Sequence, residues 1–405
     1  MDKRQLALSI FSEWRTDKRF IDNLFETRLF RSEIETADKN WIQFIVSGTI
    51  ERFFSLDYVL KKVTSNKFNK NKQIIRNILY LASYELLFSG NQHYAVINES
   101  VNLAKKNKKK FEASIINGVL REVSKQKDAL LEEINKSTDV EIKYNIPKSL
   151  HQLLIKEYSE ADLIGWYSLL YQNPKRFWAR RNRLAVSIDD PFIRVNSFSE
   201  IKAELLAGQI TIQDKAAGMV CEYLSPKEKS RILDFCSAPG GKATYLAELT
   251  NDNAEIVATD SDAFRLSKVE ENIKRLQLNS VHTKSVEELV PNSYDQVLVD
   301  IPCSGIGVLG KRRDMAYFFN PETLDELETL QKEILEQAKQ FVKPGGELII
   351  STCTIFSREN MDLVHHFLKS SPKFTQSEEP LVCLPFSGET DGAFAIKLKR
   401  YGAEE

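Results

Sequence analysis

The chain has 405 residues, of which 42% are hydrophobic and 28% are charged, and its formal net charge is −1. This is the composition of an ordinary globular protein, and the length favours two or three domains. No stretch approaches the ~18 consecutive apolar residues of a membrane span. The start, Met1-Asp2-Lys3-Arg4, lacks the apolar segment of a secretory signal. We therefore expect a cytoplasmic protein.

Residues 1–130 have the pattern of an all-helical domain. Apolar residues recur at three- and four-residue spacing from Leu6 onward, proline is absent before Pro147, and glycine occurs only at 48, 90 and 118. After the first helical stretch, the pattern predicts helices at 41–54, 71–88, 94–106 and 111–124.

Charge is distributed unevenly along the chain. Residues 1–128 carry 23 Lys and Arg against 15 Asp and Glu, a balance of +8, which leaves −9 for the remainder. A basic front part favours a polyanionic partner. The stretch Lys105–Lys110 is its most basic segment. It fits both cations at a helix C-terminus and a patch that contacts phosphates.

Residues 131–213 are predicted to hold linker helices and a short RNA-contacting module. The polar stretch 125–148 is a linker or connecting helix, and 149–171 has a helical pattern. In 174–213, arginines alternate with aromatic residues, which suits stacking on unpaired bases together with phosphate contacts. The alternative is the edge of a small sheet, with arginine stems along apolar surface. The residues are Arg176, Arg180, Arg181, Arg183 and Arg194, with Phe177, Trp178 and Phe192.

Residues 214–405 alternate between strand and helix patterns, which predicts an α/β domain with a doubly wound parallel sheet. Pro344-Gly345-Gly346 is expected to break the chain before one strand. Such sheets bind ligands at the carboxyl ends of their strands. The predicted strands are 231–235, 255–259, 296–300, 347–352 and 393–398, and the predicted helices are 242–250, 262–276 and 323–341.

The segment Ile-Leu-Asp-Phe-Cys-Ser-Ala-Pro-Gly-Gly-Lys at 232–242 predicts a cofactor loop between a strand and a helix. It lacks the spacing of a nucleoside-triphosphate cradle. Asp260 ends the next predicted strand, 20 residues beyond Gly240, where an acid accepts hydrogen bonds from ribose hydroxyls. An adenosine-containing ligand without phosphate, S-adenosylmethionine, fits both features. The candidate cofactor-binding residues are Cys236, Ser237, Ala238, Pro239, Gly240, Gly241, Lys242, Asp260 and Asp300.

Two cysteines, Cys303 and Cys353, follow later predicted strands, and Asp300 ends one of them. Methylation of carbon 5 of cytosine requires a nucleophile at carbon 6 and an acid near ring nitrogen 3. Asp300, Cys303 and Cys353 are therefore the candidate catalytic residues, and the chemistry alone does not rank the two thiols. The five cysteines form no Cys-x-x-Cys pair, so we expect neither a disulfide framework nor a metal site.

Three motifs together resemble the RNA 5-methylcytosine methyltransferases of the NOL/NOP/Sun type. They are the cofactor loop, Asp-Ile-Pro-Cys-Ser-Gly-Ile-Gly-Val at 300–308 and Ser-Thr-Cys-Thr at 351–354. The front part, through 74–88, 95–101 and 116–121, is similar to the NusB-like RNA-binding domain of the bacterial RsmB/Sun branch. The likeness covers nearly the whole chain, and it implies a Rossmann-like methyltransferase domain at 214–405 behind an all-helical NusB-like domain.

The resemblance implies a role for each site residue. Cys353 would be the nucleophile, Cys303 would assist product release, and Asp300 would touch both cofactor and base. Residues 236–242 would hold the methionine end of S-adenosylmethionine, and Asp260 its ribose.

The implied substrate is a cytosine in small-subunit (16S) ribosomal RNA. Transfer RNA or another RNA is the alternative substrate, and a non-catalytic RNA-binding assembly factor is the alternative function. We expect a monomer.

Three departures from the family pattern stand out. Thr283–Glu287 lacks the usual adenine-contacting Asp, for which Glu287 could substitute. The module at 174–213 is shorter than usual. Gly310–Asp314 lacks the usual proline before its Asp.

Overall fold

The computed structural model describes residues 2–64, 72–109, 111–171, 177–186 and 188–402. The chain forms two compact units. The first combines Met1–Leu153 with Arg312–Asn320, and the second combines Leu154–Lys311 with Pro321–Glu405. The helical unit thus extends past residue 130 and takes in a short segment from the second half of the sequence. Among the described residues, no helix is long and apolar enough to cross a membrane.

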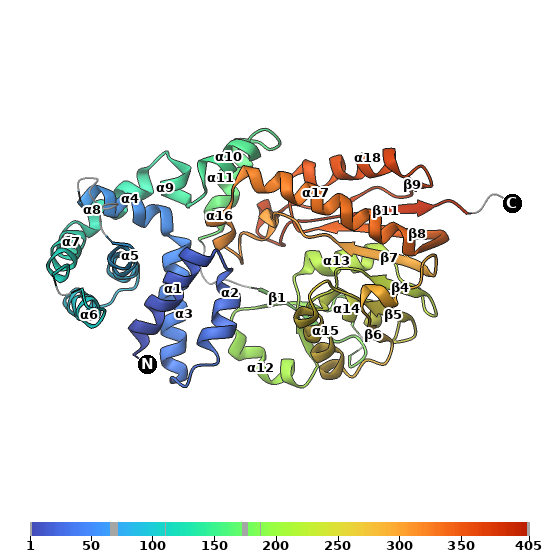
Figure 1. The fold of residues 1–405 in the computed structure, drawn as a ribbon, viewed down its shortest axis with the longest axis horizontal. Coiled ribbons are helices and arrows are strands. Elements are labelled where there is room, and N and C mark those ends of the chain that lie inside the picture. Colours follow the sequence, from blue (N-terminus) through green and yellow to red (C-terminus); the bar gives the residue numbers. More distant parts are fainter. Residues whose placement is uncertain (1, 65–71, 110, 172–176, 187, 403–405) are drawn as a thin grey trace. The chain divides into compact units, whose positions relative to one another are not determined.

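The first unit is helical, as its sequence pattern predicted (Figure 1). The single helix predicted at 41–54 is wrong in its bounds. Two helices occupy this region, and they meet at Arg52, whose backbone (φ −111°, ψ 17°) is not helical. The helices are α1 (Lys3–Asp17), α2 (Ile21–Leu24), α3 (Thr36–Glu51), α4 (Phe53–Val63), α5 (Gln73–Phe88), α6 (His93–Lys106), α7 (Ala113–Lys125), α8 (Lys127–Lys136), α9 (Val140–Tyr144) and α10 (Lys148–Leu154).

The segment Arg312–Asn320 is held in the first unit by an aromatic cluster and a buried hydrogen bond. It contains the short helix α16 (Asp314–Phe318). The Tyr317 ring lies 4.4 Å from that of Trp14 and 4.6 Å from that of Phe53. The buried Asp314 carboxylate accepts a 2.7 Å hydrogen bond from the Ile21 amide, in the first turn of α2. The tandem basic and aromatic residues of 312–320 gave no sequence signal for this packing.

The second unit is built on a sheet with helices on both faces, which confirms the predicted doubly wound fold (Figure 1). The sheet is mixed and not all parallel as predicted, because β11 pairs antiparallel with β8, β9 and β10. In the part of the chain that the structure describes, the strand order is β10-β11-β8-β7-β4-β5-β6, with β9 paired to β11. Strands β6, β5, β4, β7 and β8 are parallel, and β11 runs antiparallel to β8. The strands are β4 (Arg231–Asp234), β5 (Glu255–Ala258), β6 (Val281–Thr283), β7 (Tyr294–Asp300), β8 (Val342–Thr352), β9 (Phe374–Gln376), β10 (Leu381–Cys383) and β11 (Ala393–Arg400).

Successive strand residues belong to two apolar clusters, one on each face of the sheet. Ile232 lies in the cluster with residues of α13, α14 and α15, whereas its neighbour Leu233 lies in the cluster with residues of α17 and α18. This alternation is the period of two that a strand covered on both faces requires. The helices of this unit are α11 (Glu160–Leu169), α12 (Phe198–Leu206), α13 (Lys215–Leu224), α14 (Gly241–Leu249), α15 (Ala263–Leu276), α17 (Pro321–Ala338) and α18 (Met361–Ser370).

The turn predicted at Pro344-Gly345-Gly346 is not a break. These residues lie within β8, and the pairing of β7 with β8 shifts register between Tyr294 and Gln296 to accommodate them. A strand irregularity of this kind absorbs a proline and two glycines without ending the strand.

A three-stranded sheet forms the module ahead of the large sheet. Its order is β2-β1-β3, and both pairings are antiparallel. Its strands are β1 (Phe177–Arg181), β2 (Phe192–Val195) and β3 (Ile210–Ile212).

The predicted RNA contacts of Arg180 and Phe192 are wrong, because both side chains are buried. Arg180 forms an ion pair with Glu248 at 2.6 Å, with both side chains fully buried, and Phe192 packs edge-on against Tyr245. Arg194 donates to the carbonyl of Glu389 at 2.7 Å. Arg181 is exposed, and Arg176 lies outside the described residues. The sheet interpretation of this segment therefore accounts for Arg180 and Arg194.

Removing one partner of the Arg180–Glu248 pair should destabilise the second unit strongly. We expect Glu248→Ala to lower the free energy of unfolding by about 3–5 kcal/mol, because it leaves a buried guanidinium without its counter-ion. Urea unfolding measures the change. The matched control is Glu132→Ala, which removes an exposed pair with Lys136 and should cost less than about 1 kcal/mol. Equal losses in the two variants would contradict the assigned role of the buried pair.

Candidate active site

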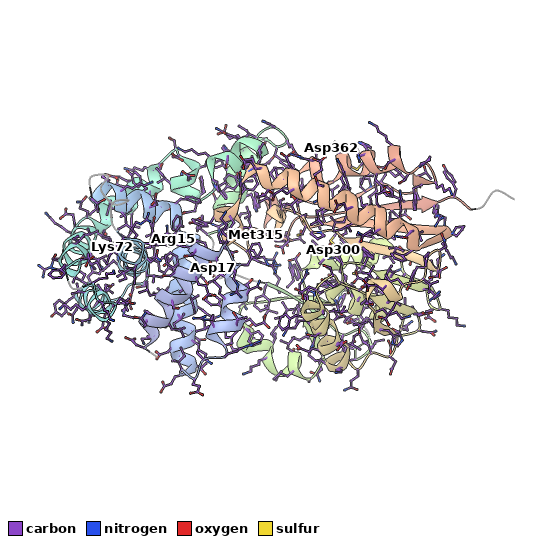
Figure 2. All side chains as sticks on the ribbon, in the orientation of Figure 1. Arg15, Asp17, Lys72, Asp300, Met315 and Asp362 are labelled. Carbon is purple, nitrogen blue, oxygen red and sulfur yellow. The ribbon has the colours of Figure 1, made fainter. Side chains whose placement is uncertain are left out.

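The site residues lie where the strand order of the sheet reverses. From β4 the chain continues to β5 and β6 on one side, whereas β7 and β8 pair on the other side. A ligand crevice forms at the carboxyl ends of the strands at such a point. The cofactor loop follows β4, Asp300 ends β7 (Figure 2), and Cys353 follows β8. The structure thus brings together the three motifs that the sequence analysis selected.

The loop between β4 and α14 is fixed by backbone hydrogen bonds to the neighbouring strands. The Ser237 amide donates to the Thr259 carbonyl at 2.9 Å, and the Gly240 amide donates to the Ser237 carbonyl at 2.7 Å. Gly240 has φ +94°, and a Cβ there would lie 2.9 Å from Cγ1 of Val269. A side chain at Gly240 is therefore excluded both by conformation and by packing.

Two residues of α15 hold the carbonyls of the same loop. Arg265 donates to the Ala238 carbonyl and Asn272 donates to the Pro239 carbonyl, both at 3.0 Å. The Ala238–Pro239 peptide bond is cis. At Gly241, a Cβ would meet no atom nearer than Nε2 of Gln213, at 3.6 Å. The loop is therefore held in place by hydrogen bonds from α15, and the space beside the Gly241 backbone, at the start of α14, is free.

The Cys236 thiol lies among apolar side chains, and this environment does not suit a catalytic role. It packs against the cluster that covers one face of the sheet, and burial raises the pKa of the thiol. Only the backbone of Cys236 is suited to contact a ligand at the loop.

Asp260 lies beside the loop, two residues beyond β5. One carboxylate oxygen, Oδ2, accepts from the Ala238 amide at 3.2 Å, and Oδ1 accepts from the Asp262 amide at 3.1 Å. Arg265 lies 3.5 Å from Oδ1. Each carboxylate oxygen has a second lone pair, so Asp260 retains capacity to accept hydrogen bonds from a diol.

Asp300 is oriented by two partners. Lys242, in the first turn of α14, donates to Oδ2 at 2.5 Å, and the Ser351 hydroxyl of β8 donates to Oδ1 at 2.9 Å. Burial alone lowers the pKa of Lys242, but the charge and hydrogen bond of Asp300 outweigh burial and raise this pKa overall. Lys242 therefore keeps its positive charge, and its contact with Asp300 links the cofactor loop to the ends of β7 and β8.

The first turn of α14 is also held from the small sheet. Arg180 donates to the Gly241 carbonyl at 3.2 Å and to Thr244 Oγ1 at 3.4 Å, and it donates to Oε1 of Gln213. Its guanidinium lies 4.3 Å from the centre of the Tyr245 ring. Sequence analysis placed Arg180 on the RNA, whereas its contacts make it a support of the cofactor loop.

The two candidate catalytic thiols are adjacent. Sγ of Cys303 lies 3.4 Å from Sγ of Cys353, and the Cys353 amide donates to Sγ of Cys303 at 3.4 Å. The hydrogen bond with Cys353 and burial raise the pKa of Cys303 well above its ordinary value. The two loops that carry these cysteines contact Glu359 and Asn360, neither of which the sequence analysis selected. Their only sequence signal was their place just before an apolar-periodic helix.

Asp234 at the end of β4 is a buried carboxyl group. It is 1% exposed, and burial raises its pKa to about 7, although Ser237 donates to its Oδ2 at 2.8 Å. Its Oδ1 has no hydrogen-bond partner among the described residues. A carboxyl group with one unpaired buried oxygen, next to an open glycine backbone and Asp260, fits a polar ligand such as S-adenosylmethionine. Residues 236–242 would hold its methionine end and Asp260 its ribose.

The raised pKa of Asp234 predicts a pH-dependent stability. Its folded pKa of about 7 exceeds the ordinary value of 3.8, so the folded state holds a proton that the unfolded state has lost. The contribution of Asp234 to stability is therefore greatest below pH 3.8 and declines as pH rises through about 7. Asp234→Asn has no carboxyl group to ionise, so we expect its free energy of unfolding to fall less with rising pH than that of wild type. The difference between the two free energies of unfolding should therefore grow between pH 3.8 and about 7. Urea unfolding at pH 5, 6, 7 and 8 measures it, and a difference independent of pH would contradict the assignment.

Comparison with known proteins identifies both parts of the chain. Residues 1–125 match the NusB family, and residues 221–394 match the family described as 16S rRNA methyltransferase RsmB/F. Ribosomal RNA small subunit methyltransferase B of Proteus mirabilis is 30% identical over 399 residues, covering 91% of this chain and 92% of the relative. The protein of the same name from Klebsiella pneumoniae is 28% identical over 403 residues, covering 91% of each.

Solved structures share the fold. The crystal structure of PH0851 aligns over 99% of both chains with a TM-score of 0.78 at 20% identity. A methyltransferase homolog from Pyrococcus horikoshii aligns over 63% of this chain and 99% of its own, with a TM-score of 0.51 at 22% identity. Residues 221–394 have the fold of an S-adenosylmethionine-dependent methyltransferase, and residues 1–125 form a NusB domain. The chain therefore belongs to the 16S rRNA methyltransferase RsmB/F family, also known as the RsmB/Sun branch.

Proposed function

We propose that this protein methylates carbon 5 of a cytosine in small-subunit (16S) ribosomal RNA through a covalent adduct with Cys353. The observation that carries the proposal is the pair of thiols 3.4 Å apart, on loops that follow β7 and β8, with Asp300 ending β7. One thiol suffices to attack a ring, whereas two adjacent thiols suit a reaction that must both form and release an adduct.

Three residues of the chain, Cys353, Cys303 and Asp300, take part in this reaction. The Cys353 thiolate forms a bond to carbon 6, an acid near ring nitrogen 3 assists the addition, and carbon 5 becomes enamine-like. S-adenosylmethionine supplies, when bound, an electrophilic methyl group for carbon 5. A base then removes the proton from carbon 5, and the bond between sulfur and carbon 6 breaks to restore Cys353. Asp300, held by Lys242 and Ser351, is the carboxylate at the ring.

The contact between the two thiols suggests why Cys303 acts only after methyl transfer, when the adduct is released. In the free protein, the hydrogen bond with Cys353 is the largest cause that raises the pKa of Cys303, followed by burial. Once Cys353 is bonded to the ring, its sulfur is a neutral thioether, which can neither donate a hydrogen bond to Cys303 nor ionise beside it. Cys303 can then lose its proton to solvent without a second thiolate beside it, and we assign the resulting thiolate as the base that accepts the proton leaving carbon 5.

The RNA class rests on the relatives and on the surface of the first unit. The bacterial relatives are named as ribosomal RNA small subunit methyltransferases. Lys105 and Lys108 are exposed at the C-terminus of α6, and Phe111 nearby is 95% exposed. Cations beside an exposed aromatic ring suit single-stranded RNA. The same chemistry on transfer RNA stays the alternative, and the complete set of catalytic groups argues against a non-catalytic assembly factor.

Single cysteine variants should separate the two thiol roles. We expect Cys303→Ala, incubated with S-adenosylmethionine and unmodified small-subunit RNA, to accumulate a covalent protein–RNA band on a denaturing gel. Cys353→Ala should give no band and no methyl transfer, yet it should bind S-adenosylmethionine with the affinity of wild type, because its thiol bonds the RNA. Calorimetry measures that affinity.

The opposite pattern, a band with Cys353→Ala alone, would exchange the two roles. If neither variant gave a band with small-subunit RNA or transfer RNA, the covalent mechanism would be contradicted. Bisulfite sequencing of cellular RNA, with and without the gene, identifies the methylated molecule.

Neutralising cations at the end of α6 should weaken RNA binding through phosphate contacts. We expect the double variant Lys105→Gln/Lys108→Gln to reduce the slope of log affinity against log salt by roughly 1.4 for two contacts to a single strand. Cofactor affinity should not change. The control Lys202→Gln/Lys229→Gln removes two exposed lysines of the second unit. An unchanged slope in the first variant, or an equal change in both, would place the RNA elsewhere.

A further inference from the structure

We propose that Glu359 and Asn360 are positioning residues that hold the two cysteine loops in register, Glu359 the Cys303 loop and Asn360 the Cys353 loop. The inference rests on the proposed function, because it explains why two consecutive residues form hydrogen bonds to the neighbours of the two reacting cysteines. Both residues are buried, with exposures of 1% and 8%, and both lie in the turn between Cys353 and α18.

Glu359 holds the loop that follows β7. Its Oε1 accepts from the Ser304 amide at 2.8 Å, and its Oε2 accepts from the Ser304 hydroxyl at 2.5 Å. Gln331 of α17 connects Glu359 to the same loop, because its Nε2 donates both to Oε1 of Glu359 and to the Pro302 carbonyl, each at 3.0 Å. Ser304, which follows Cys303, is therefore held by Glu359 directly. Pro302, which precedes Cys303, is held by Gln331, which in turn contacts Glu359.

Asn360 holds the loop that follows β8. Its Oδ1 accepts from the Thr352 hydroxyl at 2.5 Å, and its Nδ2 donates to the Thr354 carbonyl at 3.2 Å. These are the residues on either side of Cys353. Asn360 therefore fixes Cys353 from both neighbours, as Glu359 and Gln331 fix Cys303.

Direct contacts between the two loops leave little room for adjustment. The Gly307 amide donates to the Cys353 carbonyl at 3.1 Å, and a Cβ at Gly307 would lie 2.7 Å from that oxygen. The Ser304 and Thr354 hydroxyls are 2.8 Å apart. The loops thus form one hydrogen-bonded body whose anchors are the side chains of residues 359 and 360.

A role in stability alone does not explain this choice of residues. Burying a carboxylate costs more than burying an apolar side chain of similar size, even where hydrogen bonds compensate. The hydrogen bonds of Glu359 and Asn360 end on the neighbours of the two thiols. A residue chosen for packing would have no reason to select those atoms.

Alanine variants should have opposite effects on the covalent adduct. In Glu359→Ala the Cys353 loop is still held, so the adduct forms, but the displaced Cys303 releases it slowly. We expect an accumulated protein–RNA band and kcat lowered by about 10- to 100-fold, with the KM for RNA within about twofold. Asn360→Ala displaces the nucleophile and should give no band, even combined with Cys303→Ala. A defect of folding would affect both variants alike.

Two further variants serve as controls. Glu359→Gln keeps an oxygen for the Ser304 amide, and the Ser304 hydroxyl can turn to Thr354, so it should restore most of the activity lost in Glu359→Ala. Asp362→Ala removes an exposed carboxylate in the first turn of α18 (Figure 2) and should behave as wild type. Bands of equal intensity in Glu359→Ala and Asn360→Ala would overturn the proposal, as would failure of Glu359→Gln to restore activity.

A measurement without RNA separates this inference from the proposed reaction. Phenylarsine oxide binds two thiols that are held side by side, so it reports the spacing of Cys303 and Cys353 in the protein alone. We expect wild type, Glu359→Gln and Asp362→Ala to bind it, and Glu359→Ala and Asn360→Ala to bind at least tenfold more weakly, with Cys303→Ala as the blank. If no variant formed an RNA adduct, the proposed reaction would fail, yet this titration would still decide the inference. Unchanged binding in both alanine variants would overturn it.

Discussion

The parallel pairing of β4 with β7 is the constraint on which the site depends. Ile232, Leu233 and Asp234 pair with Gln296, Val297 and Leu298, and β7 pairs in parallel with β8 in turn. Parallel strands end at one edge of a sheet, so a glycine loop, a carboxylate and two thiols from distant parts of the chain must meet there. The strand order reverses at the same place, which is where open α/β sheets bind their ligands. Hydrogen bonds then only need to orient groups that the topology has already brought together.

The adjacency of Cys303 and Cys353 gives two identical side chains different chemistry. Two thiolates at 3.4 Å would repel each other in a site of low polarity, so ionisation of one opposes ionisation of the other. The hydrogen bond and burial favour the protonated form of Cys303 and raise its pKa. The same contact lets the state of Cys353 control Cys303 during the proposed reaction. This coupling works only while the loops keep their distance, and the buried turn at residues 359–360 therefore matters more than its place in the sequence suggests.

Sequence reasoning succeeded where local pattern and topology agree, and it failed where a partner lies far along the chain. The glycine loop, Asp260, Asp300 and the alternation of strands and helices are readable because each follows from adjacent residues. Arg180 was misread because an arginine among aromatic residues has the same local pattern whether it faces RNA or a buried Glu248, 68 positions away. Glu359 and Asn360 were missed for the same reason, since their partners become visible only when the loops of two strands are placed side by side. The packing of α16 into the helical unit depends likewise on aromatic partners from the front of the chain.

The contacts of the short module at residues 177–212 are better explained by support of the cofactor loop than by RNA binding. The Arg180 guanidinium donates hydrogen bonds to Glu248, to Gln213 and to the first turn of α14. Trp178 lies between the cations of Arg194 and Lys215, and its indole donates to the Glu389 carbonyl. A cation that already has buried or stacked partners would have to lose them before it could neutralise a phosphate. Some exposed lysines of residues 1–128 also have partners, such as Lys72 with Glu112 and Lys106 with Asp2, whereas Lys105 and Lys108 form no ion pair with a described residue. Under the proposed function, the electrostatic attraction of RNA is assigned to the helical unit, whereas the module in front of the large sheet holds the cofactor loop.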